Sequence, residues 1–514
     1  MRDMREWWQP KRLIGPAILA LIFILAAGEI TDPDFFWHLA NGRLIWETRT
    51  IPRVDPFSFT AHGKEWICHE WLSELIMYGV GRTLGEAGLI ALGALTITGA
   101  FGLVLARAGG TEDGSVVSPY PAALATLLAA LSSLPTWGVR PQMVTLLFAS
   151  ITLYILEGGK PLWALVPLQV LWVNMHGGFL LGPTLTFAFA LGTAIEGRRE
   201  RRLTARIRTG RRFARLCLTG AAQIAASLVN PYGARMLIYP LQTLTSNAMR
   251  EYIVEWHSPD FHAPGFQPLA VLILALMGTF TLSRKRPTAP RLVLLLGATY
   301  AALSSARHIP FLAIVAAPVL GEQIAGLRDK SAGGQEGKYT GHVRTLITRP
   351  VSRTFAICLA LVLIAGLSAA CAWRLYVAAE NNDAAQMKHY PVRAVDFMEA
   401  HHITGPLFNR YSWGGYLIWR GHTPFIDGRA DVYGDEFLKT YVEIYDARVS
   451  PHEIFEQYGI NCALVEAKSP IATLLEESGW HRVYQDELAA VLLKDRCQCP
   501  SPQQRLGERP IALR

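Results

Sequence analysis

The sequence predicts an α-helical polytopic membrane protein of about eleven transmembrane helices, with a small α/β domain outside the membrane. Of its 514 residues, 51% are hydrophobic and only 18% are charged, whereas soluble globular proteins carry about 25% charged residues. Long apolar runs occur throughout residues 13–376, whereas residues 388–496 have the composition of a soluble protein. This composition excludes a single soluble domain, a disordered chain and a collagen-like chain.

Eleven segments approach the length of about 20 mainly apolar residues that a membrane-crossing helix needs. They are 13–30, 88–106, 119–134, 140–157, 161–175, 177–195, 216–229, 267–283, 291–306, 309–325 and 354–376. The first follows Arg2, Arg5, Lys11 and Arg12, as in a signal peptide. No small-residue cleavage site precedes Thr31 convincingly, so we expect a retained helix.

The arginines predict the orientation of the chain. Loop 196–215 holds nine arginines and two glutamates, a net charge of +7 within a total of +8. Positively charged loops stay in the cytoplasm, so we place this loop there. With eleven spans, the N-terminus and the basic loops 284–291 and 326–353 are then cytoplasmic too. The excess charge is therefore a topology signal and does not indicate nucleic-acid binding.

This topology divides the chain into a transmembrane domain (1–376), an extracytoplasmic α/β domain (377–496) and a polar, Pro-rich tail that we expect to be disordered (497–514). Loops 31–87, 135–139 and 230–266 also lie outside. We expect a multi-pass protein of the bacterial plasma (inner) membrane, with the lipid bilayer as its first partner.

The long outer loop 31–87 and the terminal domain both predict ordered structure. In the loop, Trp37, Trp46, Trp66 and Trp71 suit the aromatic belt of a membrane surface. We expect a surface helix at 36–45 and an amphipathic helix at 69–84. In the domain, helices are expected at 391–402, 435–447 and 470–478. Short apolar runs predict strands at 406–409, 424–427, 461–467 and 489–495.

Seven cysteines are scattered along the chain, at 68, 217, 358, 371, 462, 497 and 499. None forms a CxxC pair or a His/Cys cluster typical of zinc sites. We predict unpaired thiols, and the alternative is a disulfide between Cys462 and the Cys497-Gln-Cys499 segment.

The sequence Asp32-Pro33-Asp34 lies just beyond the first span. Carboxylates near a membrane are costly unless they are paired, hydrated or metal-bound. Pro33 restricts Asp32 to an extended conformation, which leaves two carboxylates available as a general base or as ligands of a divalent cation such as Mg²⁺ or Mn²⁺. The alternative is a helix cap at a hydrated boundary.

Other polar residues gather at the outer ends of the expected spans rather than at their centres, as a cavity open to the outer leaflet requires. They are His38, Asp55, His69, Glu70, Arg140, Asn174, His176, Asn230, Glu255, His257, Arg307 and His308. Arg140 and Arg307 carry the donor fork that matches phosphate oxygens, so a lipid phosphate is the expected ligand. The alternatives are arginines that extend to the headgroups and a His176 that caps a Gly-Gly turn.

In the terminal domain, Trp413, Asp427, Arg429 and Asp431 lie in glycine-containing segments, YSWGGYLIW and FIDGRADVYGDEF. These side chains either contact substrate or form structural turns and salt bridges.

Together, the first span, the acidic first loop and the outer terminal domain resemble the GT-C superfamily of polyprenyl-phosphate-sugar-dependent glycosyltransferases. The run from Asp32 to His38 is similar to the Asp-Pro-aromatic motif of oligosaccharyltransferase catalytic subunits. Trp413-Gly414-Gly415-Tyr416 is similar to their Trp-rich acceptor motif, but it lacks the Trp-Trp-Asp core, which disfavours a peptide acceptor.

About 90% of the chain also resembles an uncharacterised, widespread family of bacterial polytopic membrane proteins. The motifs that carry this resemblance are DPDFFWHLANGR, IPRVDPFSFT, HEWLSE, RPQ, NMHGGF, NPYG, EWHSPDF, RHIPFLAIVAAP and YSWGGYL with FIDGRADVYG.

The GT-C resemblance implies transfer of a sugar from a polyprenyl-phosphate-linked donor to an extracytoplasmic glycan, lipid or protein acceptor. Asp34 is the preferred base or metal ligand, followed by Asp32, and Arg307 and His308 bind the phosphate. The remaining expected substrate-binding residues are Arg140, His176, His38, His69, Glu70, Trp413, Asp427 and Arg429. The alternative function is a non-enzymatic transporter or scaffold for envelope polysaccharide. We expect no nucleic-acid partner.

Overall fold

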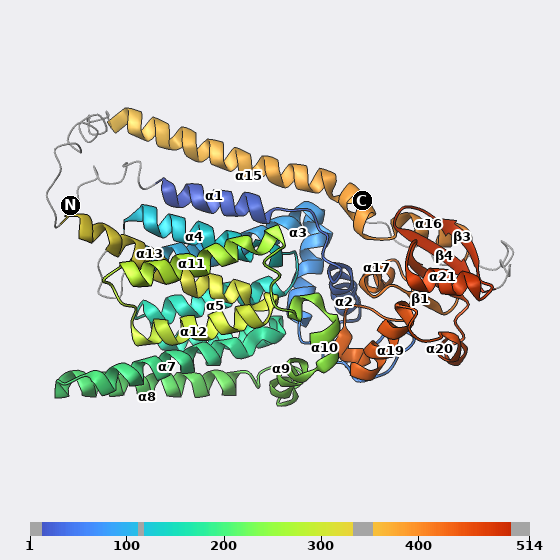
Figure 1. Cartoon of the computed structure of the whole chain (residues 1–514), viewed down its shortest axis with the longest axis horizontal. Coiled ribbons are helices and arrows are strands. Elements are labelled where there is room, and N and C mark those ends of the chain that lie inside the picture. The colour runs from blue at the N-terminus through green and yellow to red at the C-terminus, as the bar shows by residue number, and fades with distance from the viewer. Residues whose placement is uncertain (1–12, 111–117, 333–352, 495–514) are drawn as a thin grey trace.

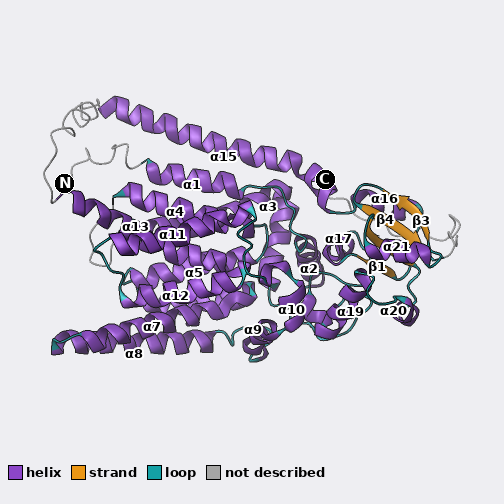
Figure 2. Ribbon diagram, viewed as in Figure 1, coloured by secondary structure: helices purple, strands orange, loops and turns teal. Residues whose placement is uncertain are grey.

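The computed structural model describes residues 13–110, 118–332 and 353–494. Most of the described chain is helical. Long helices lie roughly side by side in a bundle, and the terminal domain sits beyond one end of it (Figure 1). All strands belong to that domain (Figure 2).

The bundle contains eleven of the described helices, most of them apolar. They are α1 (Ile14–Ala26), α3 (Trp71–Ala108), α4 (Pro119–Ser133), α5 (Gln142–Glu157), α6 (Leu165–Met175), α7 (Leu181–Arg199), α8 (Leu203–Ala226), α11 (Gln267–Leu282), α12 (Ala289–Ser304), α13 (Ile309–Ala332) and α15 (Arg353–His389). Within the described ranges, five helices are long and apolar enough to cross a membrane, and four shorter helices are also apolar. The chain is thus a membrane protein by composition and fold, and the count of eleven spans stays a prediction.

Burial distinguishes the centre of the bundle from its edge. The apolar part of the segment Ala306–Leu327 is 78% buried, whereas that of Cys358–His389 is only 6% buried. The first segment contains five alanines and two glycines, small residues that let helices approach closely. Helix α13 therefore forms the core, and α15 runs along the outside of the bundle (Figure 1).

The helices predicted at 69–84 and 88–106 are the two parts of α3, which is interrupted at Gly85 by a non-helical conformation whose φ of 63° favours glycine. One expected boundary differs from the structure. The arginine-rich segment 196–215 is mainly helical, because α7 ends at Arg199 and α8 begins at Leu203. Arginine is a good helix former, so this segment extends the helices instead of forming an irregular loop.

Shorter helices lie between the bundle and the terminal domain. They are α2 (Phe35–Thr48) from the outer loop, and α9 (Arg235–Thr245) and α10 (Asn247–Tyr252) from the segment 230–266. The outer loop is therefore structured, as the sequence predicts. Trp37 and Trp66 share one apolar cluster with Phe425 and Ile426 of the domain, so the loop and the domain bury a common core.

The terminal domain is a small α/β unit. Its strands β1 (Leu407–Asn409), β2 (Cys462–Glu466), β3 (His481–Gln485) and β4 (Ala489–Leu493) form one sheet in the order β1-β2-β4-β3. Strands β1 and β2 are parallel and the other pairs are antiparallel. Its helices are α16 (Val392–Ala400), α17 (Gly414–Trp419), α18 (Ala430–Tyr433), α19 (Asp435–Tyr445), α20 (His452–Gln457) and α21 (Pro470–Glu477).

The prediction of a strand at 424–427 is wrong, and β3 was not predicted. The Asn409 side chain accepts from the Phe425 amide at 2.8 Å and donates to the Ile426 carbonyl at 2.8 Å. A side chain thus binds backbone groups that a strand would pair. Strand β3 has no apolar run, since its exposed and half-buried residues alternate at the edge of the sheet.

The described cysteines are free thiols: Cys68, Cys217, Cys358, Cys371 and Cys462. Cys497 and Cys499 lie outside the described residues, as do the predicted disordered tail and most of the basic segment 326–353.

Candidate active site

Helix α2 begins at the acidic motif of the first outer loop. The Asp32 carboxylate accepts from the Asp34 amide at 3.0 Å and pairs with the Arg140 guanidinium at 3.2 Å. The Asp34 side chain makes no capping hydrogen bond to α2. Its Oδ1 instead accepts from the Trp37 indole at 3.1 Å. The Asp32 carboxylate is therefore paired with a cationic side chain, and the Asp34 carboxylate has fewer interactions.

The surroundings of Asp34 raise the pKa of its carboxyl group to near neutrality. Burial, and next the charge of Asp32, raise the pKa of Asp34 to about 7, although His38, Arg140 and the Trp37 hydrogen bond oppose this rise. A general base is most effective when its pKa lies near the operating pH. Asp34 therefore has the acidity that proton abstraction requires.

The terminal domain covers Asp34 directly. Gly428, in the loop before α18, is so close that a Cβ atom there would overlap Oδ1 of Asp34. The Tyr411 hydroxyl donates to the Gly428 carbonyl at 3.1 Å. The site is thus built jointly by the first outer loop and the terminal domain.

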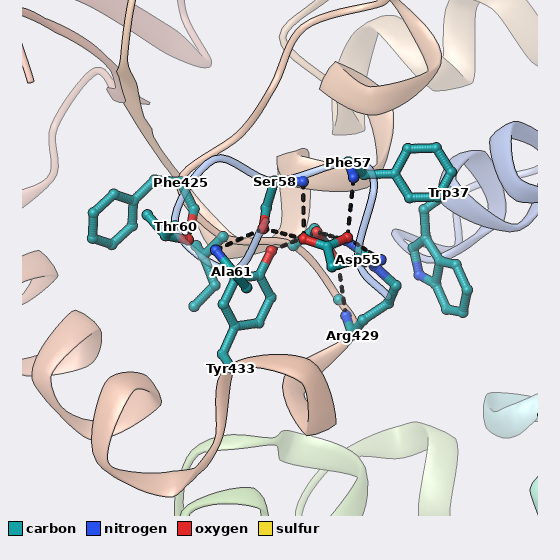
Figure 3. A network of polar contacts seen from close by, with 12 residues as sticks. Trp37, Asp55, Phe57, Ser58, Thr60, Ala61, Phe425, Arg429 and Tyr433 are labelled. Carbon is teal, nitrogen blue, oxygen red and sulfur yellow. Dashed lines mark hydrogen bonds and ion pairs between the residues drawn. The ribbon is translucent and has the colours of Figure 1, made fainter. Parts of the chain in front are cut away.

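A buried ion-pair network holds the Gly428 loop in place (Figure 3). Arg429 pairs with Asp427 of its own loop and with Asp55 of the outer loop, each at 2.7 Å. Its guanidinium also lies 4.7 Å from the centre of the Trp66 ring. The Tyr433 hydroxyl donates to Asp427 at 2.6 Å. Asp427 and Arg429 therefore form a salt bridge, as the structural alternative predicts. Their contact with substrate stays a prediction.

The two predicted phosphate-binding arginines differ in their partners. Arg140 pairs with Asp32 and, at 2.6 Å, with Glu255, so its charge is compensated. Arg307 forms no ion pair with any described residue, and its guanidinium lies 5.3 Å from the centre of the Trp256 ring. Next to it, His308 Nδ1 has no hydrogen-bond partner within the described ranges. Arg307 is therefore the arginine available to an anion.

Three histidines surround Glu70, at the start of α3. Glu70 lies 3.3 Å from His176 Nε2, 3.6 Å from His69 Nε2 and 3.6 Å from His38 Nδ1. Burial opposes its charge, but His69, His38 and His176 together lower the pKa of Glu70. Despite burial, Glu70 raises the pKa of His69 to about 9. Glu70 and His69 are therefore an ion pair at neutral pH.

His176 is neutral, because burial lowers its pKa to about 3. Its Nδ1 accepts from the Gly178 amide at 2.9 Å, so the ring proton is on Nε2, which faces Glu70. This geometry agrees with the turn-capping alternative for His176, and it also directs the histidine toward the acidic cluster.

One cluster in the described chain has the ligand types and spacing of a divalent-cation site: His38, Glu70 and Glu74. Their ligand atoms lie within 4.8 Å of one another, and His38 Nδ1 is 3.0 Å from Glu74 Oε1. The predicted metal ligands Asp32 and Asp34 are not among them. Asp32 pairs with Arg140, and Asp34 accepts a hydrogen bond from Trp37.

The structure thus connects the sequence-predicted residues Asp32, Asp34, His38, His69, Glu70, Arg140, His176 and Arg307 through contacts or direct charge interactions. Trp413 is separate from them, because it is fully buried and its indole donates to the His389 carbonyl at 3.1 Å. Its predicted substrate contact stays untested.

Three further residues of the site were not selected as functional from the sequence: Tyr239, Tyr411 and Gly428. Gly428 stands in the motif FIDGRAD, where the pattern indicates only a tight turn. Tyr239 and Tyr411 carry no sequence signal, because a single tyrosine beside apolar residues is common in any buried segment.

Comparison with solved structures found 19 matching chains, among them the following three, all of low identity. ArnT from Cupriavidus metallidurans bound to undecaprenyl phosphate is 13% identical with a TM-score of 0.49, over 94% of this chain and 98% of that chain. The apo form of ArnT gives 13% identity and a TM-score of 0.48, over 94% and 97%.

The archaeal oligosaccharyltransferase AglB from Archaeoglobus fulgidus, in complex with an inhibitory peptide and a dolichol-phosphate, is 12% identical with a TM-score of 0.51, over 88% of this chain and 69% of that chain. No family model and no curated protein matches the chain. The likeness to AglB shows that the two chains share a fold, as the resemblance to oligosaccharyltransferase catalytic subunits predicts.

Proposed function

We propose that this protein is a glycosyltransferase that moves a sugar from a polyprenyl-phosphate-linked donor to an extracytoplasmic acceptor, with Asp34 as the general base. The observation that carries the proposal is the position of Asp34, a shielded carboxyl with a pKa of about 7 between the first outer loop and the terminal domain. The GT-C fold supports it, because AglB was solved with a dolichol-phosphate.

The proposed reaction is a single displacement. An acceptor hydroxyl oxygen attacks the anomeric carbon of the sugar, and the bond from that carbon to the phosphate oxygen breaks. The acceptor proton moves to Asp34, and the bonding electron pair leaves with the lipid phosphate. General-base assistance of this kind contributes about 10²–10⁴-fold in rate.

Arg307 is the proposed phosphate ligand, because no carboxylate of the described residues forms an ion pair with it, although Glu255 attracts its charge from farther away, and because it lies beside Trp256. A fork of guanidinium donors stabilises the charge that develops on the leaving oxygen. Arg140 has a different proposed task. Its charge lowers the pKa of Asp34 and so keeps a useful fraction of that base ionised at neutral pH.

A divalent cation stays a prediction of the GT-C resemblance. His38, Glu70 and Glu74 fit its ligand chemistry better than Asp32 and Asp34 do, because they offer one imidazole and two carboxylates within 4.8 Å. Bound there, a cation would supply positive charge next to the base.

The proposed location is the bacterial plasma membrane, with the N-terminus in the cytoplasm and the terminal domain outside. A transporter is disfavoured by a buried ion-pair network at the opposite end of the bundle. There, Glu157 binds Arg107 at 2.6 Å and Arg291 at 2.8 Å, and Arg291 binds Glu322 at 2.8 Å. Alternating access would have to break this network, which joins α3, α5, α12 and α13.

The test compares a deletion strain complemented with wild type, Asp34→Asn or Asp34→Ala. The deletion strain is expected to accumulate a polyprenyl-phosphate-linked sugar and to lose one envelope glycan product, both measured by mass spectrometry. Neither variant should restore the product, although both should reach the membrane in wild-type amounts. Full rescue by Asp34→Ala would exclude Asp34 as the base, and an unchanged lipid and glycan profile on deletion would exclude the function.

A further inference from the structure

A cavity of about 600 Å³ lies beside the candidate active site. Its lining comes from helix α9, the terminal-domain segment 430–435 and the outer loop. The lining residues are Glu65, Ile67, Arg235, Ile238, Tyr239, Gln242, Thr243, Ser246, Met249, Ala430, Asp431, Gly434 and Asp435. A volume of this size falls within the roughly 300–1,000 Å³ of small-molecule sites.

Tyr239 and Asp431 connect this cavity to the active site. The Tyr239 and Asp431 side chains both line the cavity and interact electrostatically. The Tyr239 ring lies 4.4 Å from the His69 ring, and its hydroxyl is 3.5 Å from His69 Nε2. His69 in turn pairs with Glu70. A ligand in the cavity would therefore contact Tyr239 and Asp431, and Tyr239 connects through His69 to Glu70 of the candidate active site.

The charge of the lining restricts the ligand. Three carboxylates, Glu65, Asp431 and Asp435, face one cation, Arg235, and that cation is paired with Glu65. Asp435 is also occupied, since it accepts from the Ser246 hydroxyl at 2.7 Å and from the Asn247 amide at 3.0 Å. The lining thus has a net negative charge and no uncompensated cation, which disfavours a phosphate or carboxylate ligand.

The neutral polar groups of the lining favour a hydroxyl-rich ligand. Gln242 and Thr243 contribute an amide and a hydroxyl from α9, and the half-buried Asp431 contributes a carboxyl. Burial raises the pKa of Asp431, so this carboxyl both accepts and, when protonated, donates hydrogen bonds. Such groups pair with sugar hydroxyls without requiring charge on the ligand.

We propose that this cavity is the acceptor site and that it binds an uncharged glycan end, with Asp431 and Tyr239 contacting its hydroxyl groups beside His69. This inference rests on the proposed glycosyltransferase function. It assigns the two substrates to different places: the donor phosphate to Arg307 and the acceptor to the cavity between α9 and the terminal domain.

The donor sugar is also rich in hydroxyl groups, so the test must separate the two substrates. The variant is Thr243→Trp, which fills the cavity from α9. Its matched control is Thr440→Trp, which fills a neighbouring cavity of about 520 Å³ lined by α19. Each variant is expressed in the deletion strain. The glycan product is quantified, and the polyprenyl-phosphate-linked sugar that co-purifies with the full-length protein is measured by mass spectrometry.

We expect Thr243→Trp to reduce the product by about tenfold or more, the cost of 1.4 kcal/mol of binding, while the donor lipid still co-purifies. Thr440→Trp should match wild type in both measurements. The unextended acceptor that accumulates with Thr243→Trp should carry no charge at its terminal sugar, as judged by anion exchange and mass.

Three results would overturn the inference. Loss of the co-purifying donor from Thr243→Trp would make the cavity a donor site, undiminished product would make it irrelevant to transfer, and an anionic terminal sugar would contradict the ligand class. None of these results refutes the glycosyltransferase itself, which fails only if deletion leaves the lipid-linked sugars and the glycans unchanged.

Discussion

Gly428 of the terminal domain packs directly on the Asp34 carboxylate of the first outer loop, leaving no room for a side chain at position 428. Two distant parts of the chain are thereby joined at the proposed base. The contact helps to bury the Asp34 carboxylate, and burial raises the pKa of this group.

We predict that Gly428→Ala lowers transfer activity by about 10²-fold, because a shift of about 1 Å in a catalytic group costs that much. The added methyl group must displace either Asp34 or the loop. Activity is measured as glycan product per amount of membrane-inserted protein. The control is Gly366→Ala, whose methyl group would meet nothing within 4 Å. Equal activity of both variants would contradict the contact.

The pH dependence of activity should report the titration of Asp34. The base works only when ionised, so activity should rise with pH through about 7, the pKa of Asp34. Asp32, His38 and Arg140 are the charged groups that act on it. Arg140 lowers this pKa, so Arg140→Gln should move the profile to higher pH. A profile that stays in place in Arg140→Gln would separate Arg140 from the base.

Asp34 should also make stability depend on pH. The folded protein raises the pKa of Asp34 from its ordinary value of 3.8 to about 7, so between these values the folded state binds more protons than the unfolded state. Stability contributed by this group therefore falls as pH rises through this window. Asp34→Asn should raise the melting temperature at pH 8 relative to wild type and change it little at pH 4. The reverse order would contradict the direction of the shift.

The sequence predicted much of the fold because apolar runs are long and local. It placed most helices of the bundle within a few residues, but it ended the last span at 376, whereas α15 continues to His389, and it treated the arginine-rich start of α8 as a loop. It also assigned a strand at 424–427, where Asn409 binds the backbone instead. In the first case charged residues form the helix, and in the second a side-chain hydrogen bond replaces strand pairing. Neither feature produces a hydrophobic pattern in the sequence.

The candidate site was predicted in part for a related reason. Asp34, Glu70 and Arg307 stand out as polar residues at the ends of apolar runs. Gly428 and Tyr239 do not, because their roles arise from contacts with segments far away in the chain. Trp413 stands out in the sequence, but the structure buries it within the domain.

The network around Arg429 should be worth more to stability than an exposed ion pair. Asp55 binds Arg429 at 2.7 Å with both side chains almost fully buried. Asp55→Asn leaves that guanidinium with Asp427 alone, and breaking a buried pair costs about 3–5 kcal/mol. The control is Arg482→Gln, which removes a partly exposed pair with Glu476 and should cost about 1 kcal/mol or less. Thermal unfolding followed by tryptophan fluorescence compares them, and equal losses would contradict the prediction.

Arg307 should carry the affinity for lipid phosphate, because it is the arginine of the site without a carboxylate partner among the described residues. Hydrogen bonds to charged groups contribute about 1.5–3 kcal/mol. Arg307→Gln should therefore weaken undecaprenyl-phosphate binding to the purified protein by about 10- to 150-fold, and Arg307→Lys should recover part of the loss. Binding is measured in lipid nanodiscs at two salt concentrations.

The matched control for this measurement is Arg235→Gln, an exposed arginine paired with Glu65, which should bind the lipid as wild type does. Arg140→Gln provides the sharper comparison. Arg140 is already neutralised by Asp32 and Glu255, so its loss should alter the pH profile of activity more than lipid affinity. If lipid binding instead depends on Arg140 and not on Arg307, the phosphate must displace those carboxylates, and the donor would lie next to Asp32 rather than beside Trp256.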